Sequence, residues 1–92
     1  MKTLNRVPLD TVVECEFIPR DMVFGTLYHS ERFSMMNHLC LCGCGMETPL
    51  PIAANEWQLT VKDGKPTITP SIQQRWPCNS HYIVTNGVAN FV

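Results

Sequence analysis

Three cysteines at alternate positions of one glycine-containing segment constrain this chain more than any other feature. The segment reads HLCLCGCG, from His38 to Gly45, and a fourth cysteine follows in CNSH, at 78–81. Clustered thiols of this kind form disulfide bonds, bind a metal or do chemistry. A chain of 92 residues buries too little surface for a robust core, so a cross-link between the two segments would add needed stability.

The N-terminus and the cysteine count favour reduced thiols. The segment MKTLNRVPLDTVV lacks the apolar core of a signal peptide, so we expect a cytoplasmic protein. Cytosolic thiols stay reduced, the total of five cysteines is odd, and cysteines two apart pair poorly. A net charge of -1 argues against nucleic-acid binding, and no apolar run is long enough to cross a membrane.

Short runs of β-branched and aromatic residues predict a mainly β fold, an antiparallel domain of six or seven strands spanning residues 1–92. Seven prolines and five glycines interrupt the chain, and no stretch keeps a clear helical period. Asn86-Gly87, between HYIVT and VANFV, is a strong hairpin signal. Helical turns are expected only at 20–24 and 71–76. The predicted strands cover 11–18, 25–29, 33–39, 57–61, 66–69, 81–85 and 88–92.

The spacing of the thiols predicts one structural zinc site. Structural zinc takes four ligands in a tetrahedron, usually a pair from each of two segments, and contributes directly to folding. The two glycines of the first segment let its backbone curl so that the thiols point inward. Cys15 stands alone and is expected in the core. Two ligand sets are open: Cys40, Cys42, Cys44 and Cys78, or two of the first three with Cys78 and His81.

Residues near these segments also suit a serine hydrolase, which needs a hydroxyl, an imidazole base and usually a carboxylate. Ser71 is the preferred nucleophile, because Pro70 fixes the chain before it and a turn after it would present amide N–H groups. Ser80 lies two residues from Cys78, where it would bond to a metal ligand. The other candidates are His38 or His81 as the base, and Glu16 or Glu47 as the carboxylate.

Several motifs together resemble one known family. EFIP, GTLYHS, HLCLCGCG, TPL, TPSI and CNSHY occur in this order from about Glu16 to the C-terminus. This pattern is similar to the BubE family of small cysteine-rich bacterial and phage proteins, which are associated with bacterial ubiquitin-like conjugation. The cysteine segment and the C-x-S-H-Y motif are specific as a pair. QQR, at 73–75, departs from the Gly-Asn expected there.

The resemblance implies a zinc-stabilised β domain with serine-type peptidase activity, which matures or deconjugates a ubiquitin-like protein. The ubiquitin-like protein or its conjugating enzymes would be the partners. The alternative is a non-catalytic zinc-binding module, such as a phage-encoded docking protein. An enzyme requires a serine beside a histidine that is not a metal ligand, whereas a docking module requires an exposed apolar patch. The implied roles are metal ligands for Cys40, Cys42, Cys44 and Cys78, nucleophile for Ser71 or Ser80, base for His38 or His81, and orienting carboxylate for Glu16.

Overall fold

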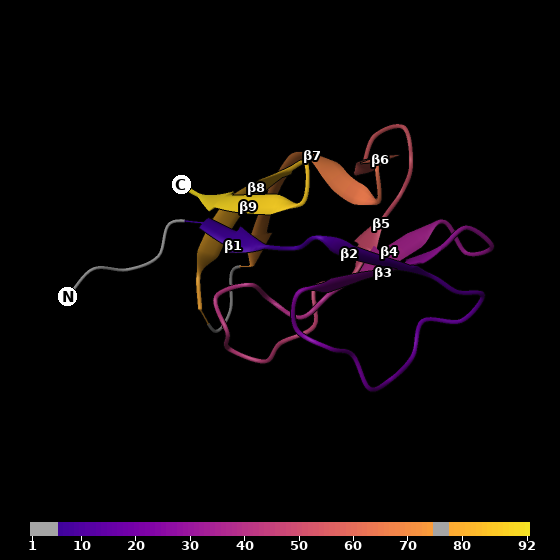
Figure 1. Cartoon of the computed structure of the whole chain (residues 1–92), viewed down its shortest axis with the longest axis horizontal. Helices are drawn as coiled ribbons and strands as arrows, with labels where there is room; N and C mark the ends of the chain where they lie inside the picture. The colour runs from indigo at the N-terminus through magenta and orange to yellow at the C-terminus, as the bar shows by residue number, and fades with distance from the viewer. Residues whose placement is uncertain (1–5, 75–77) are drawn as a thin grey trace.

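In the described residues the regular structure consists of nine strands, with no helix (Figure 1). The computed structural model describes residues 6–74 and 78–92. Its all-β content confirms the mainly β fold expected from the sequence. Within these residues no helix is long and apolar enough to cross a membrane. The strands are β1 (Arg6–Pro8), β2 (Thr11–Glu14), β3 (Thr26–Ser30), β4 (Met35–Asn37), β5 (Leu50–Pro51), β6 (Gln58–Lys62), β7 (Lys65–Gln74), β8 (Ser80–Thr85) and β9 (Val88–Phe91).

The strands form two sheets. The larger has the order β1-β9-β8-β7-β6 and is antiparallel, and the smaller has the order β2-β3-β4-β5. In the smaller sheet β2 and β3 run parallel, which the sequence did not predict. The connection over 15–25 is long enough to return the chain to the start of β2, as a parallel pair requires. Figure 1 shows the larger sheet lying over the smaller one.

The predicted hairpin at Asn86-Gly87 is present and joins β8 to β9. Asn86 and Gly87 have φ angles of 49° and 79°, the left-handed region that a two-residue hairpin turn needs at both central positions. A Cβ at position 87 would also lie 3.3 Å from atoms of Asp10 and Lys65, so the turn packs closely against its neighbours. The Asn-Gly pair therefore fixes the register of β8.

The core lies between the two sheets. Alternate residues of β7 and β8 point into it, and side chains of the smaller sheet meet them there. Each side chain in this set is at most 2% exposed. The set comprises Ile68, Ile72, Tyr82 and Val84 from the larger sheet, and Leu27 and Met36 from the smaller one.

Two predicted helical turns are wrong where the structure describes them. Residues 20–24 form bends and a turn, and β7 continues as a strand through 71–74, while 75 and 76 lie outside the described residues. Ile72 is buried against Tyr82 of β8, and this cross-strand pairing outweighs the weak local turn signal. The short strands β1 and β5 were not predicted.

Candidate active site and metal centre

A β-bulge places Ser71 on the outer face of the larger sheet. Ile68 pairs with Val84, and Ile72 pairs with Tyr82. Between these two pairs the chain advances by four residues in β7 but by only two in β8, so β7 contains two extra residues. The irregularity contains the cis Thr69–Pro70 bond and Ser71. Bulges interrupt a ladder locally and turn a side chain to a new direction.

Ser71 and His81 meet on this outer face. The Oγ of Ser71 lies 2.8 Å from the Nε2 of His81, and both residues are partly buried. Because Ile72 and Tyr82 point into the core, their strand neighbours Ser71 and His81 point to the other face. This is the hydrogen bond between hydroxyl and imidazole by which a serine transfers its proton to a base.

The indole of Trp57 holds the main chain of Ser71. Its Nε1–H donates a hydrogen bond of 3.3 Å to the carbonyl oxygen of Ser71. Trp57 immediately precedes β6, which pairs with β7 only as far as Gln58 and Thr69. The bulge is therefore fixed on one side by His81 and on the other by Trp57.

His38 lies in the core and bonds to Tyr82 rather than to a serine. Its Nε2 is 2.7 Å from the hydroxyl of Tyr82, and both side chains are fully buried. The Nδ1 of His38 has no partner among the described residues. Burial lowers the pKa of His38 to about 4, so its ring is neutral near pH 7. Of the two candidate bases, only His81 contacts a serine within the described part of the chain.

The Tyr82 hydroxyl is expected to contribute measurably to stability. In Tyr82→Phe, neither ring nitrogen of the buried His38 keeps a protein partner, and a buried unsatisfied polar group costs about 1–3 kcal/mol. For a domain of this size we expect a melting temperature lower by about 5–15 °C.

Thermal denaturation followed by circular dichroism measures this difference. Tyr28→Phe is the matched control, because the Tyr28 hydroxyl accepts from the amide of the exposed Val23, which can bond to water instead. Equal melting temperatures for Tyr82→Phe and the unaltered protein would contradict the expected role of the buried pair.

Glu16 does not orient either histidine in the structure. Its exposed carboxylate lies 2.5 Å from Arg32, and its main-chain oxygen accepts from the hydroxyl of Ser30. The placement implied by the family motif is therefore corrected: Glu16 follows β2 in the smaller sheet, whereas Ser71 and His81 belong to the larger one. Glu47 bonds to Asn37. No carboxylate bonds to His81 within residues 6–74 and 78–92.

Four thiols from two segments converge at one surface site. The Sγ atoms of the four cysteines lie within 4.8 Å of one another. Cys40 Sγ is 3.5 Å from Cys42 Sγ and 3.6 Å from Cys78 Sγ. A tetrahedral ion with metal–sulfur bonds of about 2.3 Å has sulfur–sulfur edges of about 3.8 Å, so these thiols fit such an ion. The set is Cys40, Cys42, Cys44 and Cys78.

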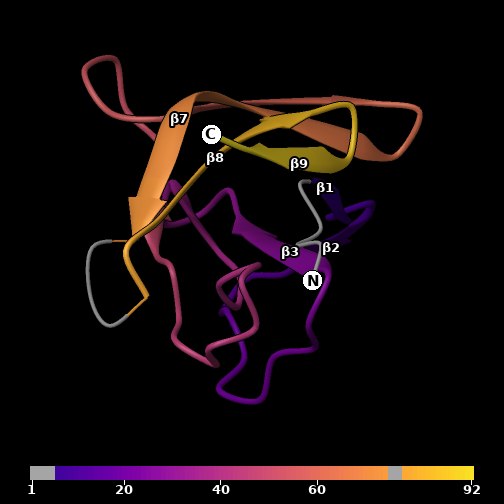
Figure 2. The same cartoon turned by 90° about the vertical axis from the view of Figure 1, so that its left-hand side faces the viewer.

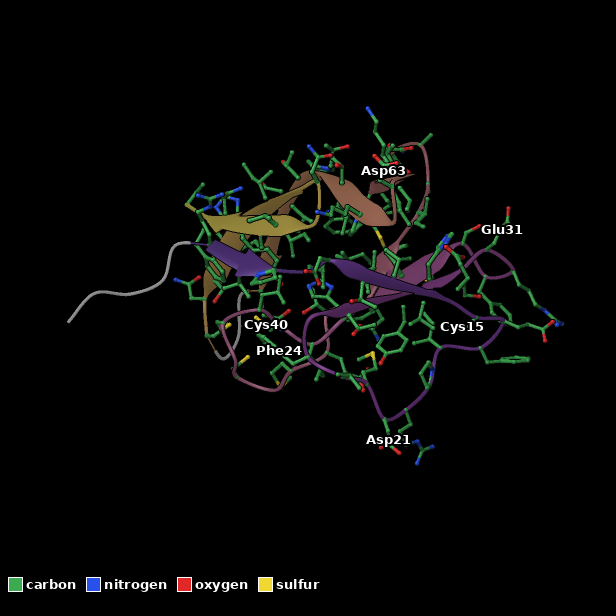
Figure 3. The ribbon with its side chains drawn as sticks, viewed as in Figure 1. Cys15, Asp21, Phe24, Glu31, Cys40 and Asp63 are labelled. Carbon is green, nitrogen blue, oxygen red and sulfur yellow. The ribbon has the colours of Figure 1, made fainter. Side chains whose placement is uncertain are left out.

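The loop that carries three of these thiols, residues 40–46, closes on itself. The amide of Cys40 donates to the carbonyl of Met46 at 2.8 Å, and Gly43 and Gly45 have φ angles of 92° and 88°. Such positive φ values favour glycine, as the sequence suggested. We call this segment the cysteine loop. Figure 3 shows Cys40 in it, well apart from the solitary Cys15.

Hydrogen bonding within the cluster favours one thiolate. Burial alone would raise the pKa of Cys78, but hydrogen bonds from Ser80, Cys42 and Cys40 outweigh it and lower that pKa to about 6. Burial raises the pKa of Cys40 to about 12. A metal ion binds cysteine as thiolate, and Cys78 supplies one near neutral pH.

Ser80 lies beside the clustered thiols, whereas its neighbour His81 contacts Ser71. Ser80 lowers the pKa of Cys78, whereas His81 bonds to Ser71 and lies outside the thiol cluster. Of the two ligand sets left open by the spacing, the structure assembles the four-cysteine set. Of the two serines, it brings Ser71 to a histidine.

Sequence reasoning missed the contributions of Trp57 and Tyr82. Both were read only as strand residues, because Trp57 is 14 residues from Ser71 and Tyr82 is 44 residues from His38. Their contacts depend on which strands pair, and no local pattern encodes that. Aromatic residues with a polar hydrogen, placed next to candidate site residues, were the available signal.

This chain matches the model of a known family. The model of the BubE family, described as a bacterial ubiquitination-like system serine protease, matches residues 14–92 of this chain. Comparisons with curated proteins and with solved structures gave no match. The matched range includes Ser71, His81 and all four clustered cysteines.

Proposed function

Because this chain belongs to the BubE family, the serine proteases of a bacterial ubiquitination-like system, we propose that it hydrolyses the bond at the C-terminus of a ubiquitin-like protein. Maturation of a precursor and release from a conjugate are the same reaction with different leaving groups. The observation that supports this proposal most is the 2.8 Å hydrogen bond between Ser71 and His81. A docking module has no need of that pair.

The reaction follows from the arrangement of the two side chains. As Ser71 Oγ attacks the substrate carbonyl, His81 Nε2 takes the hydroxyl proton and later gives it to the leaving amine. Water then attacks the resulting ester, His81 removes a proton from that water, and Ser71 leaves with its proton restored. Since no described carboxylate bonds to His81, we propose a serine–histidine pair as the catalytic unit.

Interruption of the ladder beside Ser71 also suits acyl transfer. Residues between Ile68 and Ile72 are out of regular register with β8. Main-chain N–H groups freed from a ladder are the usual donors of an oxyanion hole. We assign this role to the bulge that carries Ser71.

We propose zinc as the ion that the four thiols hold. Four thiolates in a tetrahedron are typical of structural zinc, and they leave no coordination position for substrate. When bound, zinc would supply a fixed cross-link between the cysteine loop and the start of β8. The cluster would therefore hold His81 in place through the chain from Cys78, without taking part in the chemistry.

The proposed function is tested by incubating the purified protein with the ubiquitin-like protein of the same system, extended at its C-terminus by a fluorescent protein. We expect mass spectrometry to show one cut, at the end of the ubiquitin-like domain. The same extension fused to an unrelated globular protein is the control and should stay intact. An uncut fusion, with the protease folded and metal-loaded, would overturn the proposal.

A further inference from the structure

One edge of β7 lacks a strand partner beside the candidate nucleophile. β6 pairs with β7 from Lys65 to Thr69, but β7 continues to Gln74. On its other side β7 pairs with β8 up to Gln74 (Figure 2). Among the described strands, none pairs with residues 70–73 on the β6 side.

The main-chain groups of Gln73 point to this unpaired edge. Val92 donates its amide to the carbonyl of His81 at 2.9 Å, so the main-chain groups of His81 face β9. Gln73 is the β7 partner of His81, and this pair is therefore a non-hydrogen-bonded one. The N–H and C=O of Gln73 consequently point away from β8.

The contact made by Trp57 independently indicates that the main-chain N–H and C=O of Gln73 point to the β6 side. Its indole bonds to the Ser71 carbonyl from the β6 side, and main-chain groups two residues apart in a strand point the same way. Outside the strand ladders, no hydrogen bond to the main chain of Gln73 occurs within the described part of the protein. Gln73 thus offers one donor and one acceptor at an edge close to Ser71.

We propose that an extended segment of the substrate adds as a strand to this edge and pairs its backbone with Gln73; the inference rests on the proposed protease function. Unpaired strand edges bind extended peptides through main-chain hydrogen bonds. Gln73 lies two residues from Ser71, about 6.6 Å along the strand. A peptide bond about two residues from the paired substrate residue would therefore lie beside Ser71 Oγ.

The Trp57 side chain defines one end of this binding edge. The Trp57 indole already occupies the Ser71 carbonyl, so pairing ends there. The exposed Gln73 side chain lies across from His81, and side chains of non-hydrogen-bonded pairs are close. Strand addition at Gln73 requires an extended segment of the substrate, such as a tail.

Binding without cleavage tests the inference. The probe is a fluorescent peptide that covers the tail of the ubiquitin-like protein and its cut site, added to the Ser71→Ala protein. In a series of such peptides, each main-chain amide of the peptide is N-methylated in turn. The affinity of each peptide for the Ser71→Ala protein is measured by fluorescence anisotropy. We expect one methylation to weaken binding by about tenfold, the loss of one hydrogen bond, and methylation of the adjacent amides to change it by less than about twofold.

Amide exchange locates the contact on the protein. Saturating peptide should slow exchange of the Gln73 amide by at least about tenfold, while the exposed amide of Asp63 in the distant β6–β7 turn is unchanged. In an otherwise unaltered protein, Gln73→Pro removes the N–H and should raise KM for the fusion substrate by about tenfold. If that variant misfolds, the peptide-binding and amide-exchange measurements still test whether the substrate pairs with Gln73.

The outcomes separate this inference from the proposed function. If the unaltered protein cuts the fusion but every methylated peptide binds equally well, strand addition is wrong and the protease proposal stands. If the protein neither cuts the fusion nor binds the peptide, both are wrong.

Discussion

Replacing Ser71 with alanine is expected to lower kcat/KM for the fusion substrate by at least about 10³, with fold and metal content unchanged. Ser71 is the serine that contacts His81 in the described structure, and removing its hydroxyl removes the attacking atom. Because Ser71 is only partly buried in a bulge, the substitution creates no core cavity. Thr60→Ala, which removes an exposed hydroxyl from neighbouring β6, is the matched control and should retain full activity.

His81→Gln should cause a loss of similar size, because the two side chains act as one unit. The double variant should then be no worse than either single variant. Active-site titration with a serine-reactive fluorophosphonate gives a second measurement, with labelling expected only when Ser71 is present. If Ser71→Ala stays active while folded, metal-loaded Ser80→Ala is inactive, the nucleophile is Ser80.

Replacing Cys78 with serine is expected to cost the protein most of its stability. The substitution removes the one thiol that joins β8 to the cysteine loop, and a structural metal contributes its binding free energy to folding. A loss of about 3 kcal/mol or more would lower the melting temperature by at least about 15 °C. Thermal denaturation and metal analysis by mass spectrometry measure the two effects together.

Cys15→Ser provides the matched control for that result. Cys15 is not in the cluster, and its Sγ lies 3.6 Å from the carbonyl of His29, to which a serine hydroxyl can also donate. We expect this variant to keep its metal and nearly all its stability. A strong chelator should reproduce the Cys78→Ser effect in the unaltered protein. A chelated, metal-free protein that melts at the original temperature would show that the cluster is not a structural metal site.

Local patterns predicted the parts of the fold that depend on neighbouring residues. The Asn86-Gly87 hairpin required two left-handed residues, which this dipeptide readily supplies. β1 and β5 were missed because they are three and two residues long and form only against β9 and β4. Such short strands have no periodicity to detect.

The sequence indicated which residues could form the candidate site, but not which of them contact one another. The spacing of the thiols indicated one metal site. The preference for Ser71 over Ser80 came from Pro70 before it and from an expected turn after it, and the turn is wrong because β7 continues to Gln74. The choice between His38 and His81 depends on which face each residue occupies, and hence on the register of β8 with β7. Glu16 belonged to a family motif, yet its position depends on the long connection after β2.

The bulge in β7 restricts insertions and deletions between Ile68 and Ile72. Ile68 and Ile72 both face the core, so the three residues between them keep Ser71 on the outer face. Loss or gain of one codon there would reverse the alternation and direct either Ser71 or Ile72 to the wrong side. Substitutions at 69 and 70 leave that count unchanged. Over evolutionary time positions 69 and 70 should therefore drift in composition, whereas Ser71 is kept and insertions and deletions are eliminated.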